Sequence, residues 1–437
     1  MAISKESNII IIISDALRPR DLSLYGYDIE TDNNIKKIAS ESLVFCKNFS
    51  ASNASDPSVN AIFTGKYPIN NGIIHQHPNT KEEEIEKLKK NTFWLPLYLQ
   101  KRGYSTISAT PLHMWFKKGF DFYKDRDPQE GTKKFLNIPS VNKFLLKLPS
   151  WAYTLGKKIV KSRASPYFYS CKEVMNLAIS KIEESKKPFF LFMHMVDTHC
   201  PYPGSEHKSM QGEKKINKII ENMNNSQTEY VKKRFHDMDV NCLEEVIERR
   251  NNAIHQVDEQ IGKLYNFLKD KDLWENTIFI IMSDHGDNFG EHNTYFCRGG
   301  LYDSSVHVPL IMHFPMVKSG FINEITQSID IAPTILDFLN FNKEKLDGKS
   351  LLPVTNGKKG RKYAIISDGF CEKRTAVRTQ SDKLILSDGS KCYICGAFHG
   401  PEKEFYDLKK DSEEKNNIYS EDNSLEKIYK ETTEGIK

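Results

Sequence analysis

The sequence predicts an α/β fold with a mostly parallel central sheet, and two apolar runs lead to this prediction. Five consecutive isoleucines fill the segment 8–14, and a second unbroken apolar run spans residues 278–282. Runs without polar alternation are typical of strands that are buried on both faces. An apolar stripe at helical spacing over residues 253–264 precedes the second run, and helix before strand is the order that a parallel sheet requires. After the first run, residues 33–42 have a helical pattern and residues 43–49 predict another strand.

Each of the two predicted strands ends on an acidic residue. Asp15 follows the first strand, and Asp284 with His285 follows the second. If the strands are parallel neighbours, these side chains converge at the carboxyl edge of the sheet, where ligands bind in open α/β folds. Carboxylate oxygens with an imidazole suit a divalent metal. The alternative is a polar turn that only solvates the strand end.

A hydroxyl group follows at a junction between a loop and a helix. The polar loop from Ala51 leads into a short apolar helix that ends at Gly65. The helix start aims a side chain placed there, and its N-terminus favours an anion beside it. Ser55 is therefore the candidate nucleophile and Ser58 is its competitor. The alternative is that one of these serines only caps the helix.

After about residue 355 the pattern changes to short strands separated by turns. Residues 363–368, 374–379 and 383–388 predict a small antiparallel sheet. The pair Cys392 and Cys395, with His399 after it, forms half of a zinc-binding pattern. Because a second pair is missing, the sequence favours the absence of a metal there.

Composition narrows the class of protein. Over 437 residues, 39% are hydrophobic and 27% are charged, and the net charge is +4. These values are ordinary for a soluble globular protein, and they give no indication of a nucleic-acid partner. The eight cysteines are scattered, which favours reduced thiols. No signal-peptide pattern opens the sequence, and no apolar stretch reaches the roughly 18 residues of a membrane span, so we expect a cytoplasmic protein.

A basic segment interrupts the α/β pattern. Residues 131–172 contain no acidic residue and combine lysines with aromatic and aliphatic side chains. Such a segment can lie on an anionic membrane surface, which would make the protein peripheral to the membrane. It can also line the entrance for an anionic substrate. The alternative is a helical insertion that packs its apolar side on the core.

The motifs, in this order and spacing, resemble the sulfatase family of the alkaline phosphatase superfamily. The resemblance covers nearly the whole chain, and its main segments are SDALRPRDLSLYGY from residue 14, SDPSVNAIFTGKYP from residue 55, Gly103-Tyr104 with Thr106 and His113, DTHCPY from residue 197, SDHGDNFGEH from residue 283, and DGKSLLP from residue 347. The resemblance implies a three-layer sandwich with a central, mostly parallel mixed sheet in residues 1–355. Helical insertions are expected at about 124–185 and 203–250, and a small α+β subdomain with an antiparallel sheet at 356–437.

The resemblance also implies a metal-dependent hydrolase of sulfate or phosphate esters of small molecules, glycans or lipids. One divalent ion (calcium, manganese, magnesium or zinc) would bind Asp15, Ser55, Asp284 and His285. Ser55 would be the nucleophile. His199 and Arg298 would hold the ester oxygens, and His199 or His113 would protonate the departing alcohol.

Three positions depart from the family pattern and keep alternatives open. Ala16 replaces a second acid, Val59 replaces the motif arginine and Pro111 replaces a lysine. Because the enzyme that oxidises the family's Cys or Ser to formylglycine reads that arginine, Ser55 is either formylglycine or a native hydroxyl. A transferase of phospho-alcohol groups onto lipid or glycan, and a non-catalytic protein, are the other hypotheses.

The sequence favours one metal ion over two. Asp197 and His199 match ligands of a second ion in the family. Arg298 takes the place of the third ligand, however, and only His292 remains as a substitute.

Overall fold

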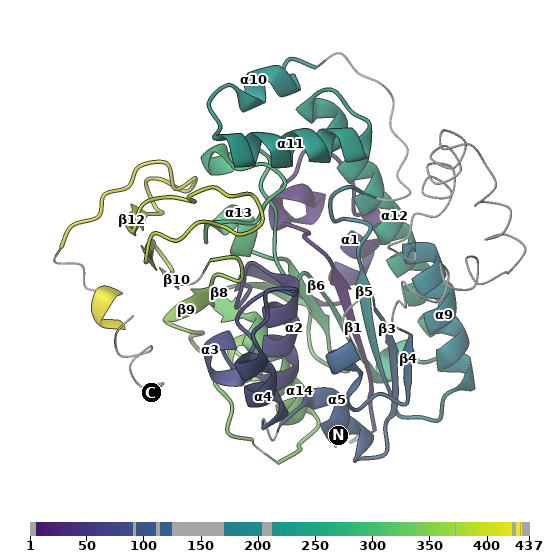
Figure 1. Cartoon of the computed structure of the whole chain (residues 1–437). Coiled ribbons are helices and arrows are strands. Elements are labelled where there is room, and N and C mark those ends of the chain that lie inside the picture. The colour runs from purple at the N-terminus through teal and green to yellow at the C-terminus, as the bar shows by residue number, and fades with distance from the viewer. Residues whose placement is uncertain are drawn as a thin grey trace, which may run out of the picture.

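Two sheets organise the chain in the computed structural model, which describes residues 6–90, 93–110, 114–124, 170–202, 212–342, 344–371, 373–421, 425–428 and 430 (Figure 1). The large sheet has eight strands in the order β4-β3-β5-β1-β6-β7-β2-β8. Its strands are β1 (Asn8–Ser14), β2 (Leu43–Phe49), β3 (Ser105–Ala109), β4 (Phe122–Lys124), β5 (Phe189–Met195), β6 (Thr277–Met282), β7 (Leu310–His313) and β8 (Gly320–Gln327). Only β7 pairs antiparallel with its neighbours in this sheet, as expected for a mostly parallel mixed sheet.

Helices cover both faces of the large sheet, which confirms the three-layer prediction. Ile9, Ile11 and Ile13 pack in one apolar cluster, and Ile10 and Ile12 pack in another on the opposite face. The first cluster includes residues of α2 (Ser55–Thr64), α5 (Leu95–Gln100) and α14 (Ile331–Phe338). The second includes residues of α1 (Asn33–Ala39), α9 (Cys171–Glu184) and α12 (Leu243–Asp270). Burial on both faces explains why β1 is an uninterrupted apolar run.

Asp258, on α12, has a structural role in joining two of these helices. Its carboxylate accepts hydrogen bonds from the backbone N–H groups of Asn34 (3.0 Å) and Ile35 (2.8 Å). These N–H groups belong to the first turn of α1 and have no partner inside that helix. Asp258 therefore caps α1 from a neighbouring helix.

Further helices belong to the large unit. They are α3 (Pro68–Asn71), α4 (Glu82–Lys89), α10 (Ile216–Ile220), α11 (Asn225–Met238), α13 (Asp303–Val306) and α15 (Leu352–Thr355). Two of them, α10 and α11, lie in the charged segment that was expected to be helical at about 203–250. Most of the basic segment 131–172 lies outside the described residues, so its contact with membranes stays a prediction. In the described part of the chain, no helix is long and apolar enough to span a bilayer.

The predicted small antiparallel sheet is confirmed. It has the order β12-β11-β10-β9, and its strands are β9 (Tyr363–Ser367), β10 (Arg374–Thr379), β11 (Asp382–Ser387) and β12 (Lys403–Asp407). Ala364 and Ile366 of β9 share an apolar cluster with Phe49 and Ile325 of the large sheet. The two sheets are thus packed together, and the domain boundary near residue 355 stays a prediction.

The register of the large sheet places the acidic residues side by side. In β1, Ile13 lies opposite Met282 of β6 on one side and opposite His194 of β5 on the other. Asp15 and Asp284 each follow these positions by two residues. Both therefore emerge at the same carboxyl edge, as the sequence predicted for parallel neighbours.

Candidate active site

Three predicted metal ligands meet at the carboxyl edge of the large sheet. Donor atoms of Asp15, Asp284 and His285 all lie within 4.8 Å of one another, and the three side chains are buried. His285 Nε2 is 3.4 Å from Asp15 Oδ1 and 3.5 Å from Asp284 Oδ2. We call this group the acidic cluster.

The acidic cluster has the properties of a cation site. Asp15 Oδ1 and Asp284 Oδ2 are buried, and neither accepts a hydrogen bond from any described residue. Buried carboxylate oxygens without partners are costly unless a cation compensates them. The Nδ1–H of His285 donates to the carbonyl of Gly286 at 2.8 Å, which leaves the lone pair of Nε2 directed at the cluster. Two carboxylates and this nitrogen fit a divalent ion.

Both carboxylates are held in their ionised form. Burial alone would raise the pKa of Asp284, but His285, His194 and Ser55 lower it well below the ordinary range. Burial and the charge of Asp284 would raise the pKa of Asp15, yet the imidazoles of His199 and His194 lower it on balance. At neutral pH the cluster therefore presents two negative charges to a cation.

Ser55 faces the acidic cluster, whereas Ser58 does not. Ser55 is the first residue of α2, and its hydroxyl donates to His285 Nε2 at 3.1 Å. The Ser58 hydroxyl instead donates to the carbonyl of Ser52 at 2.9 Å and lies 2.9 Å from Ser50 Oγ. Contacts with the preceding loop thus hold the Ser58 hydroxyl away from the acidic cluster, and of the two serines only Ser55 lies beside it.

His199 and Arg298 form a pair beside the cluster. His199 Nδ1–H donates to the carbonyl of Cys200 at 2.6 Å, so its Nε2 accepts a hydrogen bond from Arg298 Nη1. The ring centre of His199 is 6.3 Å from that of His285. Burial lowers the pKa of His199, and the positive charge of Arg298 contributes, so this imidazole is neutral at pH 7.

Other residues considered for the site lie elsewhere. Asp197 Oδ1 accepts a hydrogen bond from the backbone N–H of Cys171 at the start of α9 (3.0 Å). His292 stacks on Tyr302, with 3.4 Å between ring centres. Neither residue joins the acidic cluster. His113 and Pro111 lie outside the described residues.

His194 was not predicted as a site residue, although it lies in the middle of the site. Its Nε2 is 3.4 Å from Asp15 Oδ2 and 3.5 Å from Asp284 Oδ2. Burial by itself lowers the pKa of His194, but the two nearby carboxylates raise it to about 10. The only signal in the sequence is one imidazole within the apolar run of β5.

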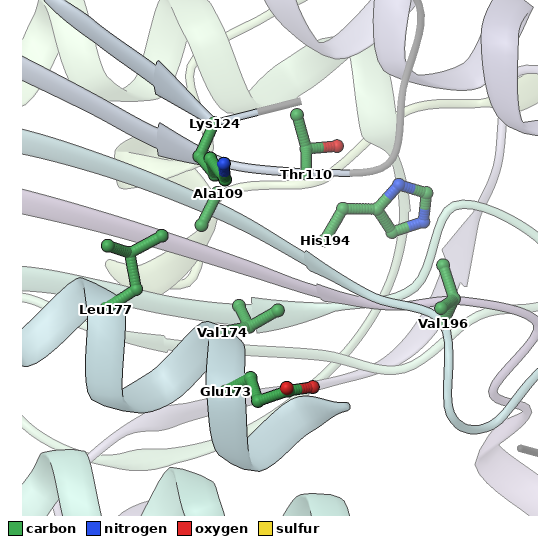
Figure 2. A pocket seen from close by; sticks show the side chains of 8 residues that line it. All are labelled: Ala109, Thr110, Lys124, Glu173, Val174, Leu177, His194 and Val196. Atoms are coloured by element: carbon green, nitrogen blue, oxygen red, sulfur yellow. The ribbon is translucent and has the colours of Figure 1, made fainter. Parts of the chain in front are cut away.

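His194 also borders a cavity of about 240 Å³ between the strand ends and α9 (Figure 2). The described lining comprises Ala109, Thr110, Lys124, Glu173, Val174, Leu177, His194 and Val196. Four of these eight side chains are apolar, and the other four are a threonine, a lysine, a glutamate and the histidine. His194 thus separates this cavity from the acidic cluster.

Comparison with known proteins identifies the family. The sequence matches the Sulfatase family over residues 7–341, and the C-terminal region of N-sulphoglucosamine sulphohydrolase over residues 290–437. The chain belongs to the sulfatase family. This confirms the resemblance seen in the motifs, and the chain is an ester hydrolase of the sulfatase type.

Individual relatives are distant but extend over most of the chain. The N-acetylglucosamine-6-O-sulfatase of Bacteroides thetaiotaomicron is 24% identical over 500 residues, covering 95% of this chain and 83% of the relative. The arylsulfatase of Clostridium perfringens is 24% identical and covers 96% of this chain and 92% of its own. The solved phosphonate monoester hydrolase of Agrobacterium radiobacter has the same fold, with a TM-score of 0.66, 18% identity, and coverage of 98% and 95% of the two chains.

Proposed function

We propose that this sulfatase-family chain hydrolyses sulfate monoesters, with the side chain at position 55 as nucleophile. The observation that carries the proposal is the position of Ser55 at the start of α2, where its Oγ lies 3.1 Å from His285 Nε2. Two of the relatives named above are sulfatases of an aminosugar and of aryl esters, which supports a sulfated glycan or small alcohol as substrate.

A divalent cation would be held by Asp15, Asp284 and His285, with the oxygen at position 55 beside it. When bound, such an ion lowers the pKa of a nearby hydroxyl and draws charge from the ester oxygens. The N-terminus of α2 adds a favourable field for negative charge at the same point.

The remaining polar side chains bind the ester and move protons. The guanidinium group of Arg298 offers a planar pair of donors that matches two sulfate oxygens. When Arg298 turns toward the ester, Nε2 of His199 loses its partner. Because His199 is neutral, it can take up the proton released by the nucleophile and return it to the departing alcohol.

Phosphate esters are the second candidate, and the surroundings of Val59 favour them. Val59 is fully buried in the apolar cluster beneath α2, so no basic side chain occupies the place of the family's arginine. If this keeps Ser55 unmodified, its native hydroxyl would attack directly, which is the chemistry of a serine that forms a covalent phosphoryl intermediate.

The first experiment is a peptide mass spectrum of the protein from its own host. A loss of two hydrogens at Ser55 means formylglycine and supports sulfate esters. An unmodified Ser55 favours phosphorus chemistry. Initial rates with aryl sulfates, phosphate monoesters and phosphate diesters then decide between the two classes. Rates that depend on an added alcohol would indicate the transferase, and absence of turnover and of bound metal would indicate the non-catalytic protein.

Two serine variants test the nucleophile itself. Ser55→Ala should abolish turnover, whereas Ser58→Ala on the same helix should keep most of it, because Ser58 bonds only to the preceding loop. Full activity of Ser55→Ala would refute the assignment.

The proposed contact of residues 131–172 with anionic membranes has a separate test. If the contact forms, more protein should sediment with acidic vesicles than with neutral ones.

A further inference from the structure

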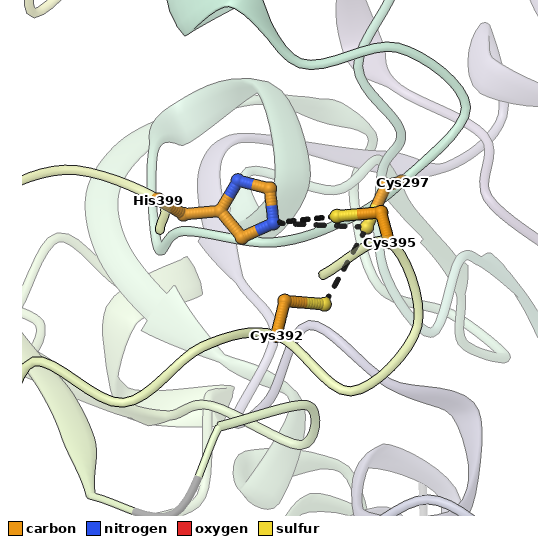
Figure 3. Close-up of side chains that lie close together, drawn as sticks. All are labelled: Cys297, Cys392, Cys395 and His399. Atoms are coloured by element: carbon orange, nitrogen blue, oxygen red, sulfur yellow. Dashed lines mark hydrogen bonds between the residues drawn. The ribbon is translucent and has the colours of Figure 1, made fainter. Parts of the chain in front are cut away.

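A second group of metal-type side chains lies apart from the acidic cluster. Cys297, Cys392, Cys395 and His399 are all buried, and their donor atoms lie within 4.8 Å of one another. Figure 3 shows the three sulfur atoms and the imidazole Nε2 turned toward a common centre. We call this group the cysteine cluster.

The spacing of the donors is close to that of a tetrahedral zinc site. Cys297 Sγ is 3.8 Å from Cys392 Sγ, and His399 Nε2 is 3.2 Å from Cys395 Sγ and 3.9 Å from Cys297 Sγ. Zinc bonds of about 2.3 Å to sulfur and about 2.0 Å to nitrogen place two sulfurs about 3.8 Å apart and a sulfur and a nitrogen about 3.5 Å apart. A disulfide would need about 2.05 Å between sulfurs, and none of the eight cysteines forms one.

The surroundings hold the four ligands in place. Thr294 Oγ1 lies 3.2 Å from His399 Nδ1 and can accept its hydrogen, which leaves Nε2 as the electron-pair donor. A tight turn closes with Gly396 at φ 69° and brings Cys392 and Cys395 together. A Cβ atom at Gly299 would lie 2.0 Å from His399 Nε2, so only glycine allows the imidazole to reach this position.

We propose that Cys297, Cys392, Cys395 and His399 bind a structural zinc ion that fastens the loop bearing Arg298 to the C-terminal sheet. Four protein ligands in a closed, buried site are typical of structural zinc. The pattern of Cys392 and Cys395 alone favoured no metal, because the third thiol comes from 95 residues away in the sequence. The proposal is independent of which ester the active site hydrolyses.

Metal analysis of full-length protein tests the proposal. Zinc is measured in the Asp284→Asn variant, purified under reducing conditions without added metal, because this variant has no intact acidic cluster to which its zinc could be credited. We expect about one zinc per chain by elemental mass spectrometry. Cys395→Ser in this background should lose the zinc, whereas Cys242→Ser, which changes a buried cysteine outside the cluster, should keep it.

Cobalt substitution gives a second readout that needs no cysteine variant. Cobalt exchanged into the Asp284→Asn protein should show the near-ultraviolet absorption of thiolate-to-metal charge transfer. Absence of zinc together with absence of this absorption would overturn the proposal. So would retention of zinc in folded Cys395→Ser, iron in place of zinc, or, in peptides of protein purified without reductant, a disulfide between Cys392 and either Cys297 or the neighbouring Cys371.

Discussion

Removing the side chain of Arg298 should weaken catalysis strongly and leave the fold intact. Arg298 Nη1 donates to His199, and the guanidinium carbon lies 4.8 Å above the ring of Phe370. The loop does not depend on this side chain, because Asn53 Nδ2 binds the backbone carbonyl of Arg298 at 2.8 Å. Arg298→Ala should therefore keep the thermal midpoint of the parent protein to within a few degrees.

The size of the catalytic loss follows from the contacts that the guanidinium can make. A hydrogen bond to a charged group contributes about 1.5–3 kcal/mol, and two such bonds to ester oxygens contribute about 3–6 kcal/mol. Arg298 is partly exposed, so the lower value of about 3 kcal/mol applies. This corresponds to a loss of about 100-fold in kcat/KM for Arg298→Ala. Arg298→Lys keeps the charge but not the planar pair of donors, and its loss should be intermediate.

The assay is steady-state hydrolysis of an aryl sulfate, or of the aryl phosphate if that class is the substrate. Added guanidinium should restore part of the activity of Arg298→Ala. Arg102→Ala is the control, because Arg102 is exposed and stacks on Tyr98 away from the site. A kcat/KM of Arg298→Ala within about threefold of the parent, with an unchanged thermal midpoint, would refute an anion-binding role.

Three further predictions concern the metal, the core and pH. Calcium or magnesium, which do not suit the thiolates of the cysteine cluster, should raise the thermal midpoint of the wild-type protein but not of Asp284→Asn, which loses one of the charges that hold the ion; an equal rise in both would contradict the ligand assignment. Asp258→Ala should lower the free energy of unfolding by about 3 kcal/mol in urea titration, because the capping hydrogen bonds at the start of α1 are lost; a loss under about 1 kcal/mol would be contrary to the capping role. Burial lowers the pKa of His292 from 6.5 to about 4, so the folded protein takes up this proton less readily than the unfolded chain. The contribution of His292 to the free energy of unfolding is therefore complete above pH 6.5 and is lost as the pH falls toward 4. In His292→Asn, the loss of unfolding free energy between pH 6.5 and pH 4 should be smaller by about 2 kcal/mol, after allowance for partial exposure of the side chain. An unchanged loss would contradict the lowered pKa of His292.

Much of the architecture could be predicted from local patterns. The two apolar runs became adjacent parallel strands, because an uninterrupted apolar strand is stable only with both faces covered. That adjacency brought Asp15 and Asp284 together as expected. Strands over residues 8–14 and 43–49, and the end of a helix at Gly65, were also predicted correctly.

What the sequence did not show depends on contacts between distant segments. Ser55 and Ser58 both belong to the first turn of α2, and only contacts made in the folded chain, with Ser50 and Ser52, hold the Ser58 hydroxyl away from the cluster. His194 lies in a run of apolar residues, where a single histidine is usually part of the core. Its role becomes visible only when the register places it beside Asp15 and Asp284.

A turn of the C-terminal sheet supports the loops that carry Ser55 and Arg298. The residues between β9 and β10 contact both functional loops: Asp368 Oδ1 accepts a hydrogen bond from Asn53 at 2.9 Å, and Gly369 N–H donates to Asn53 Oδ1 at 2.8 Å. A Cβ atom at Gly369 would lie 2.4 Å from that of Ala54, which directly precedes Ser55. Phe370 supports the guanidinium of Arg298. Since the loop that carries Ser55 and the loop that carries Arg298 both pack against the same turn, truncation before β9 should abolish turnover even though every residue of the acidic cluster remains.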